Sequence, residues 1–274
     1  MPELPEVETV KKALELKVKN RKITNLNVLY PNIFSGEEID NLKEKILGET
    51  INSVSRRGKW LIFNLDHYHL LSHLRMEGKY LYKTRNDEIK KHEHVIFTLD
   101  NDLELRYQDT RKFGKMHLIK KGELDSDNSP LKSLGLEPFD ENLNIAYLKD
   151  KFKNKKLPIK TVLLDQSIVT GIGNIYANEI CFRMRIDPKT AGNKLSEKRT
   201  AEMIEVSGEI LSEAIKQGGT TIHSFDANGV TGLFQTKLQV HMQKECPTCG
   251  GSITKEKVNG RGTYYCKKCQ RRQS

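Results

Sequence analysis

The first eight residues, MPELPEVE, place a proline directly after the initiator methionine and an acidic residue directly after that proline. Methionine ahead of a residue as small as proline is normally removed, so we expect Pro2 to carry the terminal amine. Such an amine has a reference pKa of about 7.7 to 8.0 and attacks carbonyl-like carbons to form Schiff bases. Glu3 can then act as general acid or base, with Glu6 orienting it. The alternative interpretation is a simple lead into a helix.

A second group of reactive side chains lies near the C-terminus, in two Cys-x-x-Cys pairs. Each pair can hold one side of a metal ion, and two pairs complete the tetrahedron of thiolates that structural zinc prefers. Four protein ligands leave no open position for catalysis. The spacing therefore predicts one structural Zn²⁺ rather than disulfides or free thiols, with the ligands Cys246, Cys249, Cys266 and Cys269.

The stretch between the two cysteine pairs contains Asn259-Gly260, a signal for a hairpin turn that would put Arg261 at the tip. An arginine held on a hairpin is suited to binding a phosphate, although a solvated surface arginine is the other interpretation. The fifth cysteine, Cys181, lies in an apolar stretch and is expected to be a packed core residue.

The charge balance indicates an anionic partner. The 274 residues carry 46 Lys+Arg against 36 Asp+Glu, a formal net charge of +10, and nucleic acid is the leading candidate for such an excess. Glu3, Glu6 and Glu8 stand where a secretory signal would be basic, and no apolar run of about 18 residues occurs. The sequence therefore predicts a cytoplasmic protein without a membrane partner.

The hydrophobic pattern changes along the chain. A helix from Pro5 with Val7, Val10, Leu14 and Val18 on one face opens it. Short apolar and β-branched segments follow and favour an antiparallel sandwich or barrel: ITNLNVLY, TINSVS, WLIFNL, HLLSHL, HVIFTL, LELRYQ and MHLIK. Helices are then expected over IKTVLLDQ, NIYANEICFRM and about 196–217, the last ended by Gly218-Gly219.

These elements predict an α+β multidomain protein. We expect an N-terminal β-sandwich domain with its helix at 1–130, a linker at 131–145, a helical domain at 146–235 and a zinc finger at 236–274.

Seven ordered motifs resemble formamidopyrimidine-DNA glycosylases, bacterial base-excision repair enzymes, over nearly the whole chain. They are MPELPEVE, RRGKW, SHLRMEGKY, DTRKFG, LLDQSIVTGIGNIYANE, GGTTI and GRGTYYC. The resemblance implies a β-sandwich domain, a helix-two-turns-helix domain and a zinc-finger hairpin. It also implies a monomer that acts on damaged double-stranded DNA.

The resemblance assigns chemistry to particular residues. Pro2 would attack C1′ of the damaged nucleoside, expel the base and hold the sugar as an iminium, with Glu3 assisting proton transfer. Successive β- and δ-elimination would then cut the strand without an organic cofactor. The resemblance makes Lys59 and Arg261 phosphate-binding members of the catalytic site.

Further residues are implied in DNA binding. His73 and Asn174 match phosphate ligands, while Met76, Arg111 and Phe113 match the residues that fill the gap left by the flipped base. Glu6, Glu77 and the stretch SFDANGVTGLF are expected near the lesion. The connector before the finger departs from the family, because VHMQKEC replaces the usual glycine-bearing run.

Two other functions fit part of the pattern. The sister endonuclease VIII class shares the amine chemistry but prefers oxidised pyrimidines; the opening motif and the set Met76, Arg111 and Phe113 favour the purine enzyme. A non-catalytic zinc-dependent DNA-binding protein is the third interpretation, and intact Pro2, Glu3 and Lys59 argue against it.

Overall fold

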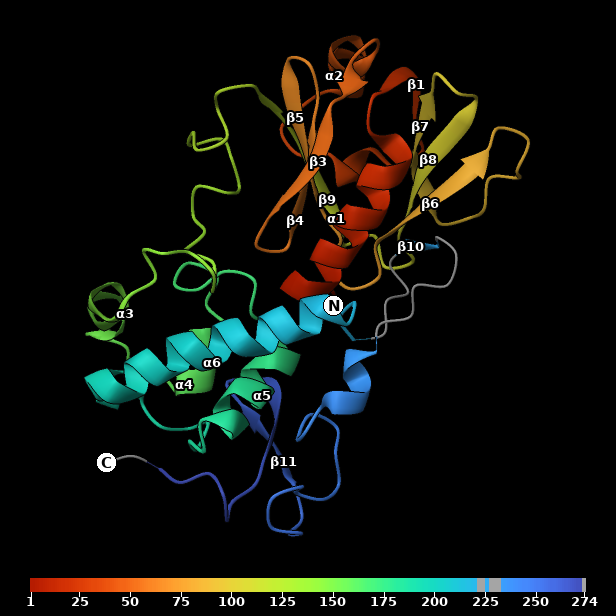
Figure 1. Cartoon of the computed structure of the whole chain (residues 1–274). Coiled ribbons are helices and arrows are strands. Elements are labelled where there is room, and N and C mark those ends of the chain that lie inside the picture. The colour runs from red at the N-terminus through yellow and green to blue at the C-terminus, as the bar shows by residue number, and fades with distance from the viewer. Residues whose placement is uncertain (221–224, 227–232, 273–274) are drawn as a thin grey trace. The chain divides into compact units, whose positions relative to one another are not determined.

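The computed structural model describes residues 1–220, 225–226 and 233–272. Within these ranges the chain forms two compact units, and the division between them falls between Lys132 and Ser133. The first unit also includes the short strand β10 (Phe225–Asp226), which pairs with it in parallel. The second unit holds the helices that follow Lys132 in the chain, α3 to α6 within residues 145–216, together with the cysteine-rich hairpin (Figure 1).

The first unit begins with helix α1 (Leu4–Val18), which starts one residue earlier than the sequence predicts. Val7, Val10, Leu14 and Val18 are all buried, as predicted from their helical spacing. The helix packs on β3 (Ser53–Arg57) and β4 (Trp60–Asn64). Glu8 on α1 accepts a hydrogen bond of 2.9 Å from Nε of Arg56, which attaches the helix to β3.

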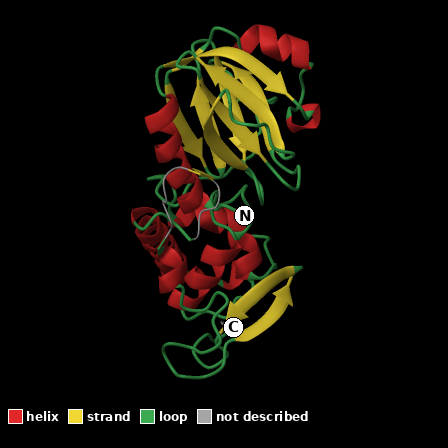
Figure 2. Ribbon diagram, turned by 90° about the vertical axis from the view of Figure 1, so that its right-hand side faces the viewer, coloured by secondary structure: helices red, strands yellow, loops and turns green. Residues whose placement is uncertain are grey.

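Two sheets make up the rest of the first unit (Figure 2). The larger has the order β10-β6-β8-β7-β1-β2 and the smaller the order β3-β4-β5-β9; every pair is antiparallel except β10–β6. Their remaining strands are β1 (Arg21–Val28), β2 (Thr50–Ile51), β5 (Tyr68–His73), β6 (Lys79–Thr84), β7 (Glu93–Leu99), β8 (Leu103–Gln108) and β9 (Lys115–Lys120). The predicted sandwich is confirmed.

One apolar core joins α1 and both sheets. At its centre the ring of Tyr80 lies 5.5 Å from that of Phe63 and 5.3 Å from that of Tyr107, both at steep angles. Edge-to-face aromatic pairs of this kind add to the free energy gained from burial alone. These three rings therefore join β4, β6 and β8 within the core.

Four features of the first unit differ from the sequence-based expectation. The stretch TINSVS is two strands rather than one: β2 pairs with β1 in the larger sheet, and β3 pairs with β4 in the smaller. The chain thus changes sheets at Asn52. Strand β6 and helix α2 (Ile39–Ile46) were not predicted, and neither was the 3₁₀ turn η1 (Pro31–Ile33).

The second unit contains α3 (Ile145–Phe152), α4 (Ile159–Leu163), α5 (Asn174–Arg183) and α6 (Glu197–Lys216), with 3₁₀ turns η2 (Gly192–Lys194) and η3 (Phe234–Lys237). On α6, the predicted apolar face is buried: Met203, Val206, Ile210, Leu211 and Ala214. Gly218 and Gly219 both have left-handed φ values, 75° and 76°, and end the helix as predicted. Helix α3 was not predicted.

A two-turn connection joins α4 to α5. The side chain of Gln166 donates to the carbonyl oxygens of Leu164 and Ile172 and accepts the N–H of Gly171, so one amide closes the connection on itself. Gly171 has φ +99°, a conformation that favours glycine. The start of α5 is thereby fixed by local hydrogen bonds.

The cysteine-rich part forms a hairpin of β11 (Thr254–Val258) and β12 (Arg261–Tyr265). Asn259 and Gly260 both have positive φ, 45° and 74°, which is the two-residue turn that their sequence predicts. None of the described helices is long and apolar enough to cross a bilayer.

Candidate active site and nucleic-acid interface

Pro2 is fixed at the start of α1. Glu3 caps this helix: its carboxylate accepts the N–H of Glu6, and Glu6 Oε2 accepts the N–H of Glu3 at 2.8 Å. This reciprocal pair satisfies two backbone donors that a helix start otherwise leaves exposed. Pro2, Glu3 and Glu6 are all buried, whereas Met1 is 49% exposed. Pro2 is therefore held in a buried position directly before the first turn of the helix.

Lys59 lies in the tight turn between β3 and β4, after Gly58 with its left-handed φ of +58°. Nη1 of Arg56 donates to the carbonyl oxygen of Gly58, and the same guanidinium binds Glu8 on α1. Burial opposes ionisation of Glu8, but the hydrogen bond and charge of Arg56 outweigh it and lower the pKa of the carboxyl. The Lys59 turn is thus held to the helix that carries Pro2.

His73 ends β5 and is held neutral. Its Nδ1 accepts the backbone N–H of Arg75 at 3.0 Å, so the proton of the neutral ring must sit on Nε2. Burial, together with the charges of Arg75 and Lys59, lowers the pKa of His73 to about 3. The ring packs edge-on to Trp60 at 4.9 Å. His73 therefore offers an uncharged N–H donor.

Two loops of the first unit bring the three predicted gap-filling residues together. Nη1 of Arg111 lies 3.0 Å from Sδ of Met76, and its guanidinium lies 4.7 Å from the centre of the Phe113 ring. Met76 and Phe113 are 46% and 50% exposed, so both apolar side chains face solvent beside the guanidinium of Arg111. Glu77 is exposed beside Met76. An exposed cluster of an apolar thioether, an aromatic ring and a guanidinium cation is suited to contact with unstacked nucleobases.

Asp109, buried completely, supports the second of these loops. Its two carboxylate oxygens accept the N–H groups of Arg111 at 3.0 Å and Gly114 at 2.8 Å. Of the stretch SFDANGVTGLF, most lies outside the described residues. Its described strand β10 pairs with Tyr80 and Leu81 of β6.

In the second unit, Asn174 opens α5 and contacts the finger. The buried ammonium of Lys160 on α4 donates to Oδ1 of Asn174, to the carbonyl of Gly262 and to the hydroxyl of Thr263, at 2.7 to 2.8 Å. Nδ2 of Asn174 also donates to the Gly262 carbonyl at 3.1 Å. One lysine thereby fixes the start of α5 beside the strand that begins with Arg261.

Arg261 is exposed at the end of the hairpin turn, as predicted. Nδ2 of Asn259 donates to the hydroxyl of Thr161 at 3.2 Å, which ties the turn to α4. Because the turn is attached on both sides, Arg261 projects from a fixed base rather than from a mobile tip.

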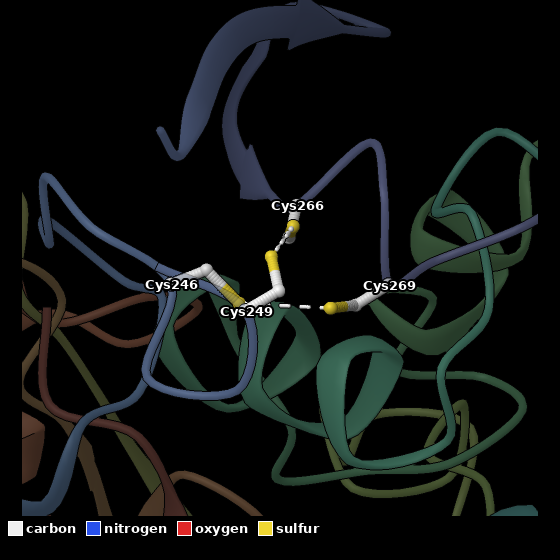
Figure 3. Close-up of side chains that lie close together, drawn as sticks. All are labelled: Cys246, Cys249, Cys266 and Cys269. Carbon is white, nitrogen blue, oxygen red and sulfur yellow. Dashed lines mark hydrogen bonds between the residues drawn. The ribbon is translucent and has the colours of Figure 1, made fainter. Parts of the chain in front are cut away.

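The four predicted zinc ligands meet, and their side chains point toward one another (Figure 3). Their sulfurs all lie within 4.8 Å, with 3.8 Å between Cys246 and Cys269 and 3.6 Å between Cys249 and Cys266. Zinc–sulfur bonds of about 2.3 Å put the corners of a tetrahedron about 3.8 Å apart. The four thiols therefore fit one structural zinc ion. Burial opposes the thiolate of Cys246, but the backbone N–H groups of Thr248 and Cys249 lower its pKa to about 7.

Family models match three consecutive parts of the chain. They are the formamidopyrimidine-DNA glycosylase N-terminal domain over residues 1–116, the formamidopyrimidine-DNA glycosylase H2TH domain over 134–226, and the zinc finger found in FPG and IleRS over 243–272. The chain belongs to the formamidopyrimidine-DNA glycosylase family. Members of this family are DNA glycosylases and abasic-site lyases, so the chain is an enzyme of base-excision repair.

Individual relatives agree over their full lengths. Formamidopyrimidine-DNA glycosylase of Oceanobacillus iheyensis is 47% identical over 98% of both chains, and that of Bacillus subtilis is 46% identical over 98% of this chain and 99% of the relative. A mutant Lactococcus lactis enzyme with Fapy-dG-containing DNA superposes with a TM-score of 0.92 at 39% identity, covering 99% of this chain and all of that one. The same enzyme with abasic-site DNA gives 0.90 at 38% identity, covering 98% and 100%.

The connector that leads to the first cysteine of the finger is fixed by two neighbouring residues of α5. The buried carboxylate of Glu179 accepts the N–H groups of Gln239, Val240 and His241 at 2.8 to 3.1 Å. Burial raises the pKa of Glu179, against the effect of these three donors. Nδ2 of Asn178 donates to Nδ1 of His241 at 2.7 Å. Three backbone N–H groups and the ring of His241 therefore attach the connector to α5.

Sequence reasoning did not identify three buried residues whose hydrogen bonds hold the loops and the connector in place, namely Asp109, Lys160 and Glu179. Asp109 and Glu179 lie inside motifs quoted for other residues, and Lys160 lies just before one of them. The only signal was that Lys160 and Glu179 are ionisable groups within apolar stretches. Cys181, in contrast, is the core residue expected, and burial raises the pKa of its thiol to about 12.

Loss of one zinc ligand is expected to remove the metal and with it the finger. Cys249→Ser should lower the zinc content from about one ion per chain to a small fraction, because a structural zinc site needs all four ligands. DNA affinity should fall at least about tenfold, since the hairpin that carries a charged phosphate donor is lost. Metal analysis and fluorescence anisotropy measure both. The matched control Cys181→Ala should keep its zinc, and loss of zinc there too would contradict the assignment.

His73 is expected to stay neutral throughout the physiological range. With a folded pKa near 3 against about 6.5 when unfolded, protons bind the unfolded chain preferentially, and stability falls as the pH drops from about 6.5 towards 3, by at most ~1.4 kcal/mol per pH unit. His73→Gln should lessen this slope in urea titrations. Ring resonances in the DNA-free protein should show the Nε2–H form at pH 5, and a His73 titration near 6.5 would refute the prediction.

Proposed function

We propose that this chain excises oxidised purines, such as 8-oxoguanine and formamidopyrimidines, from duplex DNA and then cuts the strand at the abasic site. Membership of the glycosylase family supports the reaction class. The observation that carries the chemistry is the buried Pro2 joined to the capping pair of Glu3 and Glu6. We further propose that it acts as a monomer in the bacterial cytoplasm.

The reaction starts once Met1 is removed and the amine of Pro2 is free. Its nitrogen lone pair attacks C1′ of the lesion nucleotide, the base leaves with the electrons of the glycosidic bond, and opening of the sugar ring gives an iminium. The positive end of α1 favours the neutral, nucleophilic amine. A proline iminium has no N–H proton to lose, so it remains a cation and an electron sink at any pH.

Glu3 moves the protons in this scheme. A carboxylate has about four acceptor positions, so capping the helix through one of them leaves others for the sugar. Glu3 would deliver a proton to the opening sugar ring and accept one in a later step. Glu6 holds Glu3 in place through its backbone N–H. Removal of the C2′ proton, acidified by the iminium, expels the 3′-phosphate, and a second elimination expels the 5′-phosphate.

The remaining predicted residues hold the DNA. Lys59 and Arg261 would neutralise phosphates beside the lesion, while His73 and Asn174 would add uncharged donors. Met76, Arg111 and Phe113 would fill the gap left by the flipped nucleotide, with the arginine pairing with the orphaned base. Glu77 lies next to this cluster and is proposed to contact the lesion.

Borohydride reduction in the presence of 8-oxoguanine DNA is expected to trap a covalent complex whose peptide map places the sugar on Pro2. Pro2→Gly should slow strand cutting about tenfold or more, because its primary amine gives a Schiff base that must be protonated to act as an electron sink for the eliminations. Pro5→Ala is the matched control and should trap normally. An adduct on a lysine, with Pro2 unmodified, would sink the assignment. Preference for thymine glycol over 8-oxoguanine would instead indicate the sister class.

Charge removal at the two phosphate contacts is expected to change the salt dependence of binding. Lys59→Ala and Arg261→Ala should each weaken binding to DNA of any sequence and lower the slope of log K against log salt by about one unit. His73→Gln should weaken binding without altering the slope, since His73 is neutral. Lys45→Ala, which removes a partner of Glu37, serves as the control. Unchanged slopes at Lys59 and Arg261 would exclude these phosphate contacts.

A further inference from the structure

Tyr107, near the end of β8, is a fully buried residue to which none of the predicted functions assigns a role. Its ring packs against Tyr80 in the core of the first unit. Its hydroxyl lies 3.5 Å from Oδ2 of Asp109, the residue that supports the Arg111 loop. Burial and the nearby carboxylate both raise the pKa of Tyr107, so the phenol stays protonated.

Two glycines lie against this phenol. A β-carbon added to Gly78 would lie 2.3 Å from the Tyr107 oxygen, and one added to Gly114 would lie 1.8 Å from it. Neither glycine has a left-handed φ, so backbone conformation does not demand glycine at either position. The demand is for space: both loops approach the hydroxyl more closely than any side chain allows, and at Gly78 the carbonyl oxygen of Leu74 would also lie 2.5 Å from an added β-carbon.

Each glycine closes one of the two loops that carry the gap-filling residues. The N–H of Gly78 donates to the carbonyl of Leu74 at 2.9 Å, which closes the turn that presents Met76. The N–H of Gly114 donates to Asp109, which closes the loop that presents Arg111 and Phe113. The Tyr107 hydroxyl therefore contacts both loops at the glycine where each loop closes.

The same two loops meet again at their tips, through the contact of Arg111 with Met76. The contact of Arg111 with Met76 is between exposed, flexible side chains. The contact of Tyr107 with Gly78 and Gly114, in contrast, is between a buried ring and the backbone. A buried, close-packed contact sets a distance far more rigidly than an exposed one. The paired residues His73–Lys115 and Lys79–Gln108 hold the two ends of each loop. Between those ends, the buried phenol of Tyr107 sets how closely the two loops approach each other.

We infer that Tyr107 is a positioning residue for base extrusion, because it fixes the distance between the Met76 loop and the loop of Arg111 and Phe113. The inference rests on the proposed function. Bases along a strand are spaced about 3.4 Å apart, so a wedge displaced by a fraction of that step no longer matches the gap. Errors of about 1 Å in positioning are known to cost catalysis heavily.

Tyr107→Phe and Tyr80→Phe make a matched pair for the test. Each removes one hydroxyl from a fully buried tyrosine of the same aromatic stack, but the Tyr80 hydroxyl donates to Ser72 instead of contacting the loops. Two single-turnover rates are measured for each protein: excision of 8-oxoguanine, which requires a stacked base to be extruded, and strand cutting at a preformed abasic site, which has no base to unstack.

Tyr107→Phe is expected to slow excision about fivefold or more while abasic-site cutting changes less than about twofold; Tyr80→Phe should change neither beyond about twofold. A 2-aminopurine placed opposite the lesion should change its fluorescence when wild-type protein binds. This change should be smaller with Tyr107→Phe and should match the wild type with Tyr80→Phe. Gly114→Ala, which pushes the loop away from the same hydroxyl and from the ring carbon that bears it, should lower the ratio of the two rates as well.

The inference is overturned if Tyr107→Phe keeps the wild-type ratio of excision rate to abasic-site cutting rate. That includes the case in which both rates fall together, because a general loss of structure would lower both. The wild-type reaction is the independent check on the proposed function. A wild type that neither excises the base nor forms the reduced adduct would refute that function, whereas an active wild type with an unchanged ratio refutes only the role of Tyr107.

Discussion

A nucleophile at the end of a polypeptide, as proposed for Pro2, has a single covalent tether, so its position depends on whatever fixes the residues that follow it. Here that constraint is the reciprocal pair of Glu3 and Glu6, which locks the first turn of α1 immediately after Pro2. The helix is in turn fixed by its buried apolar face and by the contact of Glu8 with Arg56. A capping motif that elsewhere serves only stability thereby sets the reach of the amine, and the acid that caps the helix is the one proposed to move protons.

The same arrangement recurs wherever a residue is proposed to touch DNA. The exposed group projects from a short turn, and a buried polar residue beneath that turn accepts or donates several hydrogen bonds. Asp109 supports the loop of Arg111, Lys160 joins Asn174 to the strand of Arg261, and Glu179 holds the connector. Buried polar groups are costly unless fully hydrogen-bonded. Each of these turns therefore has one conformation that is strongly preferred over its alternatives.

Local patterns in the sequence predicted the elements whose stability is local. The face of α6, the turn at Asn259-Gly260 and the four zinc ligands follow from spacing alone, and the structure confirms them. Strand β6 escaped because its lysines interrupt the apolar pattern, and the division of TINSVS between two sheets depends on partners far away in the sequence. The exposed residues of the site came from motif resemblance. The buried residues that hold those exposed residues in place were not predicted, because a buried Asp or Lys has no periodic signature in the sequence and its partners are mostly backbone atoms.

Glycine shows most directly what the sequence leaves undetermined. Gly171 and Gly218 adopt left-handed backbone conformations, a requirement that turn patterns and helix ends suggest. Gly78 and Gly114 are required for a different reason, the proximity of the Tyr107 hydroxyl, which lies on another strand. The first kind of glycine is a property of the local chain and is readable from it. The second kind records a tertiary contact, and in this fold that contact joins two loops whose exposed tips are proposed to enter the DNA. Replacing either kind with alanine would look equally conservative in the sequence, although the first would strain a turn and the second would move part of the interface.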